Sequence, residues 1–146
     1  MIYLLDTDTL IFMIRGLKRS ARHRDRERAR TLVERCRQAQ HDGHAVGVSA
    51  ITVSELDFGA HKSGRYEDEI AAYGKILAPF EIYDYDAVSC APHYGHIRHE
   101  LEQAGQPIGA MDLLIAAHAL GLDATVVTNN LAHFRRVPGL KVTDWR

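Results

Sequence analysis

Residues 2–10 read IYLLDTDTL, and this segment determines the kind of fold that the chain can form. Its first four residues are an unbroken apolar run, which is typical of a short strand buried within a sheet. The strand is predicted to end at Asp6, and Thr7 or Asp8 can cap a following helix that extends through Arg15. A buried strand that leads directly into a helix favours an α/β fold.

The alternation of strands and helices continues along the chain. Further strands are predicted at AVGV (45–48), EIY (81–83), ATVV (124–127) and LKVTDW (140–145). Helices are predicted between them, at residues 22–41, 52–61, 67–77, 86–105 and 111–122. The helix at 52–61 begins with Thr52 and Glu55 in the T-x-x-E form of a capping box. This pattern predicts a mainly parallel sheet flanked by helices, in one domain that spans residues 1–146.

The composition is that of an ordinary globular domain. The chain has 146 residues, of which 46% are hydrophobic, and this is enough for one core. Cys36 and Cys90 lie far apart and form no C-x-x-C pair, which fits a reducing compartment. No basic leader opens the chain, and no apolar run approaches the roughly 18 residues that cross a bilayer. We therefore expect a cytoplasmic protein that does not contact membranes.

Charge is unevenly distributed, although the net charge is only -1. Residues 15–37 carry ten Lys/Arg against three Asp/Glu, whereas the rest of the chain carries eight against sixteen. One interpretation is a solvated helix with i,i+4 ion pairs such as Arg30 with Glu34. The other interpretation is a surface that contacts phosphate groups.

Three acids lie where the ends of predicted strands can meet the first turns of helices. Asp6 follows the first strand, Glu55 opens the helix after the second strand, and Asp112 opens the apolar helix before the fourth. In a parallel sheet such positions share the edge at which ligands bind. Each acid also has an ordinary structural explanation, because acids cap helices and complement the helix dipole.

Asp112 is the acid that a structural role explains least well. It interrupts the apolar helix MDLLIAAHALGL, and a charge that enters a buried helix needs a partner. The neighbouring sequence offers no obvious basic residue, whereas a divalent cation would supply the missing charge. Ligands that are all oxygen atoms favour Mg²⁺ or Mn²⁺ over zinc. The sequence therefore predicts that Asp6, Glu55 and Asp112 hold a divalent ion.

Histidines offer a second set of candidate ligands. His93, His96 and His99 recur every third residue on one predicted helix, which permits zinc binding but is more typical of a solvated helix face. His118 and His133 lie near the proposed edge of the sheet, where either can touch a substrate.

Four motifs resemble one known family. LLDTDTL, VSAITVSELDFGA, PIGAMDLLIAAHAL and VVTNNLAHFRRVPGLKVTDW follow one another as in the PIN-domain toxins of bacterial VapBC toxin–antitoxin modules. The resemblance implies a three-layer PIN-like fold with a five-stranded sheet. It also implies a Mg²⁺- or Mn²⁺-dependent endoribonuclease that acts on tRNA or another structured RNA. A homodimer neutralised by a cognate VapB-type antitoxin is implied as well.

The resemblance assigns roles to individual residues. Asp6, Glu55 and Asp112 match the first three acids of the family, and Asn130 stands where many relatives carry a fourth. Thr7 and Thr128 match hydroxyls placed beside the acids, which implies that they orient the ligands. Asp8 departs from the asparagine usual there, so it either adds negative charge or caps the helix. The basic segment looks longer than in many relatives, and the arginines that can grip RNA are Arg19, Arg22, Arg24, Arg26 and Arg28.

Two other interpretations compete with this one. Residues 6–9 fit the D-x-D-x-T motif of haloacid-dehalogenase-type phosphatases, with Asp6 as nucleophile and Asp8 as acid and base. That interpretation lacks the paired acids that should follow a late strand, where the sequence has VVTNN instead. The second alternative is a PIN fold that has lost catalysis and serves as an RNA-binding or interaction module, and Asn130 is the observation that favours it.

Overall fold

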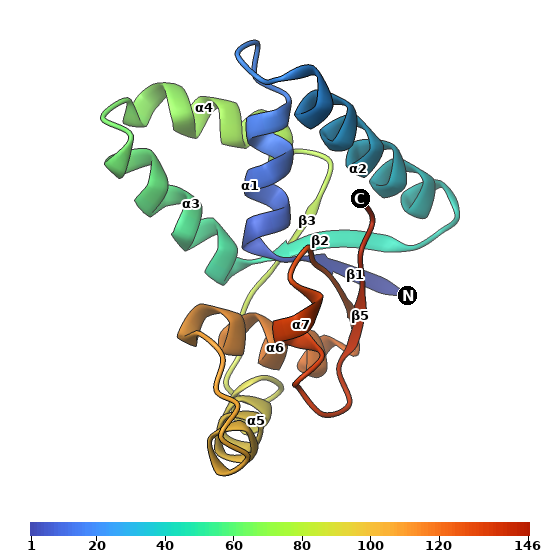
Figure 1. Cartoon of the computed structure of the whole chain (residues 1–146), viewed down its shortest axis with the longest axis vertical. Coiled ribbons are helices and arrows are strands. Elements are labelled where there is room, and N and C mark those ends of the chain that lie inside the picture. Colours follow the sequence, from blue (N-terminus) through green and yellow to red (C-terminus); the bar gives the residue numbers. More distant parts are fainter.

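A five-stranded sheet lies at the centre of the computed structural model, which describes residues 1–146 (Figure 1). Every pair of neighbouring strands is parallel, and their order is β3-β2-β1-β4-β5. The sheet is therefore wholly rather than mainly parallel, and all five carboxyl ends point to one edge. The strands are β1 (Ile2–Leu5), β2 (Ala45–Ser49), β3 (Glu81–Tyr83), β4 (Thr125–Val127) and β5 (Lys141–Thr143).

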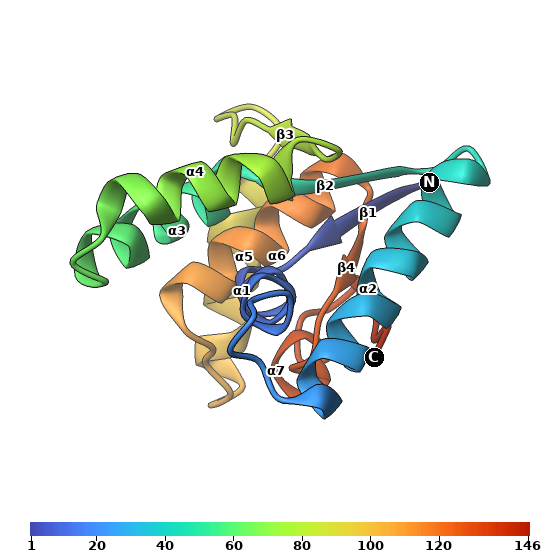
Figure 2. The same cartoon turned by 90° about the horizontal axis from the view of Figure 1, so that it is seen from above.

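Helices cover both faces of the sheet and complete a three-layer architecture (Figures 1 and 2). Alternate side chains of β1 face opposite layers: Leu4 belongs to a core with helices α5 and α6, and Leu5 to a core with α1 and α2. Helices α3 and α4 pack on each other as a hairpin that projects to one side. The helices are α1 (Thr7–Gly16), α2 (His23–His41), α3 (Ala50–Lys62), α4 (Tyr66–Leu77), α5 (Ala91–Gln103), α6 (Ala110–Leu122) and α7 (Leu131–Phe134).

Two helices begin earlier than their sequence pattern predicts. Asp6, rather than Thr7 or Asp8, caps α1, because its backbone is still extended and its carboxylate accepts a hydrogen bond from the Thr9 N–H. Ser49 caps α3 in the same way through the Ile51 N–H. The capping box at Thr52 is therefore wrong, since Thr52 already lies inside the helix.

Two further differences concern turns. The helix predicted from residue 86 begins only at Ala91, because the Asp86 carboxylate accepts hydrogen bonds from the N–H groups of Val88 and Ser89 and holds a turn. The four-residue helix α7 lies between β4 and β5, where the sequence pattern predicted no helix. Cys36 and Cys90 are both free and buried. None of the helices combines the length and the apolar character that a membrane span requires.

Candidate active site

Asp6 lies at the carboxyl end of the central strand and is almost fully buried, with 2% of its surface exposed. Its Oδ1 accepts the Thr9 N–H at 2.9 Å, and its Oδ2 accepts the Thr128 hydroxyl at 2.6 Å. Thr128 directly follows β4, the neighbour of β1 in the sheet. The parallel sheet therefore places the residues that follow two adjacent strands in direct contact. Asp6 is at once a helix cap and a candidate ligand.

At this edge the charge of Asp8 acts on two other acids, Asp6 and Asp112. Burial raises the pKa of Asp6, although the hydrogen bonds from Thr128 and Thr9 partly offset that effect. Burial likewise raises the pKa of Asp112, and the neighbouring His133 opposes the rise. The charge of Asp8 raises the pKa of both carboxyls. The negative charge of Asp8 thus acts on both Asp6 and Asp112. Of the two roles expected for Asp8, it adds negative charge, whereas Asp6 caps the helix.

Asp112 is joined to Asn130 by a histidine. His133 Nδ1 lies 3.5 Å from Asp112 Oδ2, and the Asn130 side-chain amide lies 2.8 Å from the same ring nitrogen. The Asn130 backbone N–H in turn donates to the Thr128 hydroxyl oxygen at 2.9 Å. A continuous series of contacts therefore runs from Asp112 through His133, Asn130 and Thr128 to Asp6.

Sequence reasoning named His133 only as a possible contact of the substrate and missed its contact with Asp112. The spacing of His133 from Asn130 was a signal for a contact with Asn130, but not for the contact with Asp112. The two residues are three apart across the start of α7, and residues three apart share one side of a helix.

Glu55 reaches the site through Thr7. Because α3 begins at Ala50, Glu55 lies in the second turn rather than the first. Its Oε1 accepts the Thr7 hydroxyl at 2.7 Å, and Thr7 Oγ1 is also 2.9 Å from Thr52 Oγ1. Thr7 is the residue after Asp6, so this contact connects Glu55 to the same edge of the sheet.

The structure does not bring all predicted ligands together. No group of three or more His, Cys, Asp or Glu side chains is spaced so that it can hold a metal ion. Each of the three acids predicted as ligands is instead engaged with a neighbour: Asp6 with Thr128, Glu55 with Thr7, and Asp112 with His133. The alternative zinc ligands, His93, His96 and His99, likewise form no group that could hold a metal ion.

Another predicted contact is excluded by burial. The His118 side chain is fully buried, with Nδ1 2.7 Å from the Ser49 hydroxyl, so it cannot touch a substrate at the surface. Its position on the inward side of α6 explains the burial.

The arginines predicted to bind RNA divide into two groups. Arg19 and Arg26 line one surface cavity, whereas Arg22, Arg24 and Arg28 do not.

The chemistry of the side chains nevertheless fits a hard divalent cation. The donors at this edge are carboxylate, hydroxyl and amide oxygens, which suit Mg²⁺ or Mn²⁺. The raised pKa values of Asp6 and Asp112 show that burial and the charge of Asp8 disfavour their ionised forms. A cation near these groups would favour ionisation and reduce the mutual repulsion.

Comparison with known proteins identifies the family. Residues 3–140 match the family model for the PIN domain. The chain is 36% identical over 143 residues to the tRNA(fMet)-specific endonuclease VapC of Salmonella typhimurium, with 98% of this chain and 97% of that protein covered. It is 41% identical over 102 residues to ribonuclease VapC2 of Rickettsia felis, covering 70% of this chain and 75% of the relative.

Solved structures agree with the sequence comparison. The crystal structure of VapBC2 from Rickettsia felis, bound to a DNA fragment from their promoter, matches with a TM-score of 0.84 and 34% identity over 100% of both chains. The chain therefore belongs to the PIN-domain family and, within that family, to the VapC ribonucleases.

Family membership decides between the competing interpretations of the acidic motif. The chain belongs to a nuclease family, so the phosphatase in which Asp6 would be a nucleophile and Asp8 an acid and base is wrong. The expected three-layer fold with five strands is confirmed.

Proposed function

We propose that this protein is a Mg²⁺- or Mn²⁺-dependent endoribonuclease that acts as the toxin of a VapBC-type pair and hydrolyses tRNA or another structured RNA. The observation that carries the proposal is the pair of carboxyls Asp6 and Asp112, both with raised pKa values and both within the field of Asp8. The relative named for tRNA(fMet) cleavage supports tRNA as the substrate class.

The proposed ligands are Asp6, Asp112 and Glu55, and Asn130 can add an amide oxygen or hold a water molecule. When bound, a divalent ion supplies an activated water and offsets the negative charge that develops on the phosphodiester. Thr128 fixes the orientation of Asp6 through its hydroxyl, and Thr7 does the same for Glu55. His133 lies between Asp112 and Asn130 and holds these two side chains beside each other.

The proposed partners follow from the relatives. The matching structures from Rickettsia felis and Salmonella typhimurium are VapBC complexes bound to DNA, which supports a cognate VapB-type antitoxin for this chain. We further propose that the protein forms a homodimer and is located in the cytoplasm. Because strands from both ends of the chain share one sheet, we also propose that residues 1–146 act as one PIN domain.

Cleavage of a tRNA transcript by the purified protein, freed from antitoxin, tests this function. We expect cleavage with Mg²⁺ or Mn²⁺ and none with a chelator. The rate should fall by on the order of 10² or more in Asp6→Asn and in Asp112→Asn. The matched control is Asp123→Asn, which removes the same charge from a side chain that is exposed far more, and it should leave the rate unchanged.

Sequencing of the RNA ends would then identify the cut sites, with Asp6→Asn as the blank. A parent protein that binds RNA but never cuts it would favour the binding module over the nuclease. Unchanged cleavage in Asp112→Asn would show that the ligand assignment is wrong.

A further inference from the structure

Two surface cavities meet at Lys18 and lead away from Glu55. The first has a volume of about 360 Å³ and lies between α1, α3 and α4, with Glu55 on its wall. Four cationic side chains also line it: Arg15, Lys18, Lys62 and Arg65. Its acids are Glu55 and Glu69, so positive charge exceeds negative charge along its walls.

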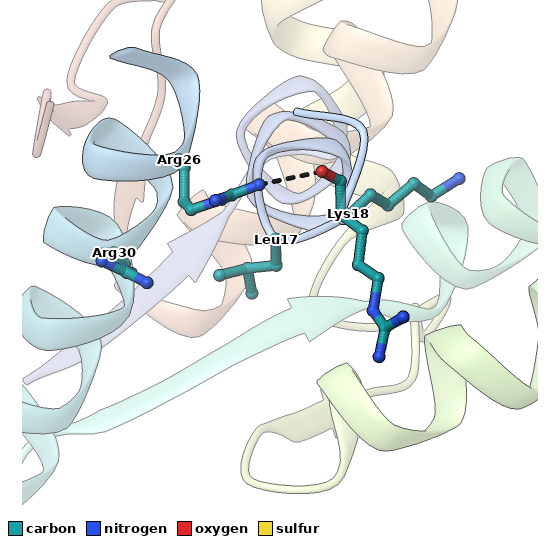
Figure 3. Close-up of a pocket in the computed structure, with 5 residues that line it drawn as sticks. Leu17, Lys18, Arg26 and Arg30 are labelled. Atoms are coloured by element: carbon teal, nitrogen blue, oxygen red, sulfur yellow. Dashed lines mark hydrogen bonds between the residues drawn. The ribbon is translucent and has the colours of Figure 1, made fainter. Parts of the chain in front are cut away.

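The second cavity lies at the junction of α1 and α2 and has a volume of about 380 Å³ (Figure 3). Lys18 lines this cavity too, so the two cavities share that side chain. Its other walls are Leu17, Arg19, Arg26 and Arg30, and no acid is among them. A series of cationic side chains thus extends from the candidate active site to the beginning of α2.

Arg26 gives the second cavity a fixed shape. Its guanidinium donates hydrogen bonds to the backbone oxygens of Arg19 at 3.0 Å and Ala21 at 3.4 Å, and Figure 3 draws the first of them as a dashed line from Arg26. These bonds hold the loop between α1 and α2 against the second helix.

The other cations of the cavity remain available to a ligand. The Arg19 side chain makes no ion pair, and Arg30 makes only an exposed pair with Glu27 at 3.1 Å. Lys18 donates a hydrogen bond to Glu69, and this bond lowers the pKa of Glu69.

We propose that Lys18, Arg19 and Arg30 bind backbone phosphates of the RNA at a second site, away from the scissile bond. This inference rests on the proposed function, because it identifies the RNA as the ligand. Guanidinium groups match phosphate oxygens in geometry and charge. RNA fits better than an acidic protein segment because the cations continue up to Glu55, so one polyanion can occupy both cavities and the cleavage site.

The test compares two arginines of the same helix. Arg30 and Arg37 are seven residues apart, which places them on the same side of α2 and about 10 Å apart along its axis. Each makes an exposed i,i+3 pair with a glutamate, Arg30 with Glu27 at 3.1 Å and Arg37 with Glu34 at 3.2 Å. Only Arg30 lines the second cavity. Arg30→Gln and Arg37→Gln therefore remove the same charge and the same kind of ion pair.

Binding of a labelled tRNA transcript is measured by fluorescence anisotropy at several salt concentrations, with chelator present so that the RNA stays intact. Arg30→Gln should weaken binding and reduce the slope of log Kd against log salt by roughly 0.7 to 0.9, the value for one lost phosphate contact. Arg19→Gln should do the same, because Arg26 binds the backbone oxygen of Arg19 and not its side chain. Arg37→Gln should leave the slope unchanged. The melting temperatures of the parent and the three variants should be alike, since exposed ion pairs contribute little to stability.

Equal effects of Arg30→Gln and Arg37→Gln would overturn the proposal, because they would report net charge alone. An unchanged slope in Arg30→Gln would overturn it as well. If Arg30→Gln instead weakened only the binding of the cognate antitoxin, the site would belong to a protein partner. A parent protein that binds tRNA without cutting it would contradict the proposed nuclease activity, while the contrast between the two arginines would still test this site.

Discussion

Negative charge is concentrated around Asp6, and this arrangement has a cost for folding. Asp6 is buried, Asp112 is half-buried, and the charge of Asp8 acts on both. Burial disfavours an ionised carboxyl, so both groups hold their protons more tightly in the folded protein than in the unfolded chain. The site thus lowers the stability of the fold at neutral pH in order to gather acids. Such a trade between stability and function is common at active sites.

Asp112→Asn should therefore raise the melting temperature at pH 7 in the presence of chelator. A carboxyl whose pKa is raised by folding stabilises the folded state while it is protonated, and this contribution is lost as the pH rises through the raised pKa. An asparagine cannot ionise and avoids the loss. The gain should shrink as the pH falls towards 4, where the parent carboxyl also becomes protonated. Thermal melts of both proteins at the two pH values measure the difference.

Asp123→Asn provides the control for this prediction. Asp123 is highly exposed and adopts a left-handed backbone, which asparagine tolerates, so its replacement should change the melting temperature little at either pH. A lower melting temperature for Asp112→Asn at pH 7 would show that the ionised carboxylate stabilises the fold.

The candidate acids could be named from the sequence, but their contacts could not. Asp6 and Asp112 are conspicuous because each adjoins an apolar run that must be buried. Glu55 contacts Thr7, the residue after Asp6, although its helix begins at Ala50. The contact of His133 with Asp112 depends on how α7 packs against α6, and no local pattern encodes that distance.

At the scale of elements, Gly16 determines how closely α1 approaches α2. A Cβ atom on Gly16 would lie 2.5 Å from Ala29 Cβ and 2.8 Å from the backbone oxygen of Asp25. Neither atom belongs to a flexible side chain, so the two helices would have to move apart. The same crossing positions Arg19 and Arg26 around the second cavity.

Gly16→Ala should therefore destabilise the protein by about 1–3 kcal/mol, the usual cost of overpacking. Gly95→Ala in α5 is the matched substitution, because nothing lies within 4 Å of the Cβ that it would add. It should stabilise the protein by about 0.5–1 kcal/mol through helix propensity alone. Urea denaturation of both variants measures the contrast. Similar changes in the two variants would mean that the α1–α2 contact does not limit the packing.

The elements themselves were largely predictable, and the differences lie at their ends. The strands β1, β2 and β4 follow apolar runs, because a strand buried on both faces must be apolar throughout, whereas the edge strands β3 and β5 include charged residues and are only partly buried. Helix starts were less certain, because Asp6, Thr7 and Asp8 can all cap a helix. The choice falls on Asp6 because the chain leaves β1 with extended backbone at that residue. That geometry follows from the sheet and not from the local sequence.

At the scale of the whole molecule, the parallel sheet brings distant parts of the chain to one edge. Strand β1 lies between β2 and β4, so the residues that follow these strands become neighbours. Asp6 and Thr128 are 122 residues apart in sequence and share a hydrogen bond. Segregation of charge adds to this arrangement, since the acids occupy the sheet edge and the basic cavities continue from it along α1.

The central claim is that Asp6, Asp112 and Glu55 hold one divalent ion, and calorimetric titration of Mn²⁺ into the antitoxin-free protein tests it most directly. We expect saturable binding by the parent and by Asp123→Asn, and loss of that binding in Asp6→Asn and in Asp112→Asn. Binding of Mn²⁺ to both of these variants as tightly as to the parent would contradict the claim.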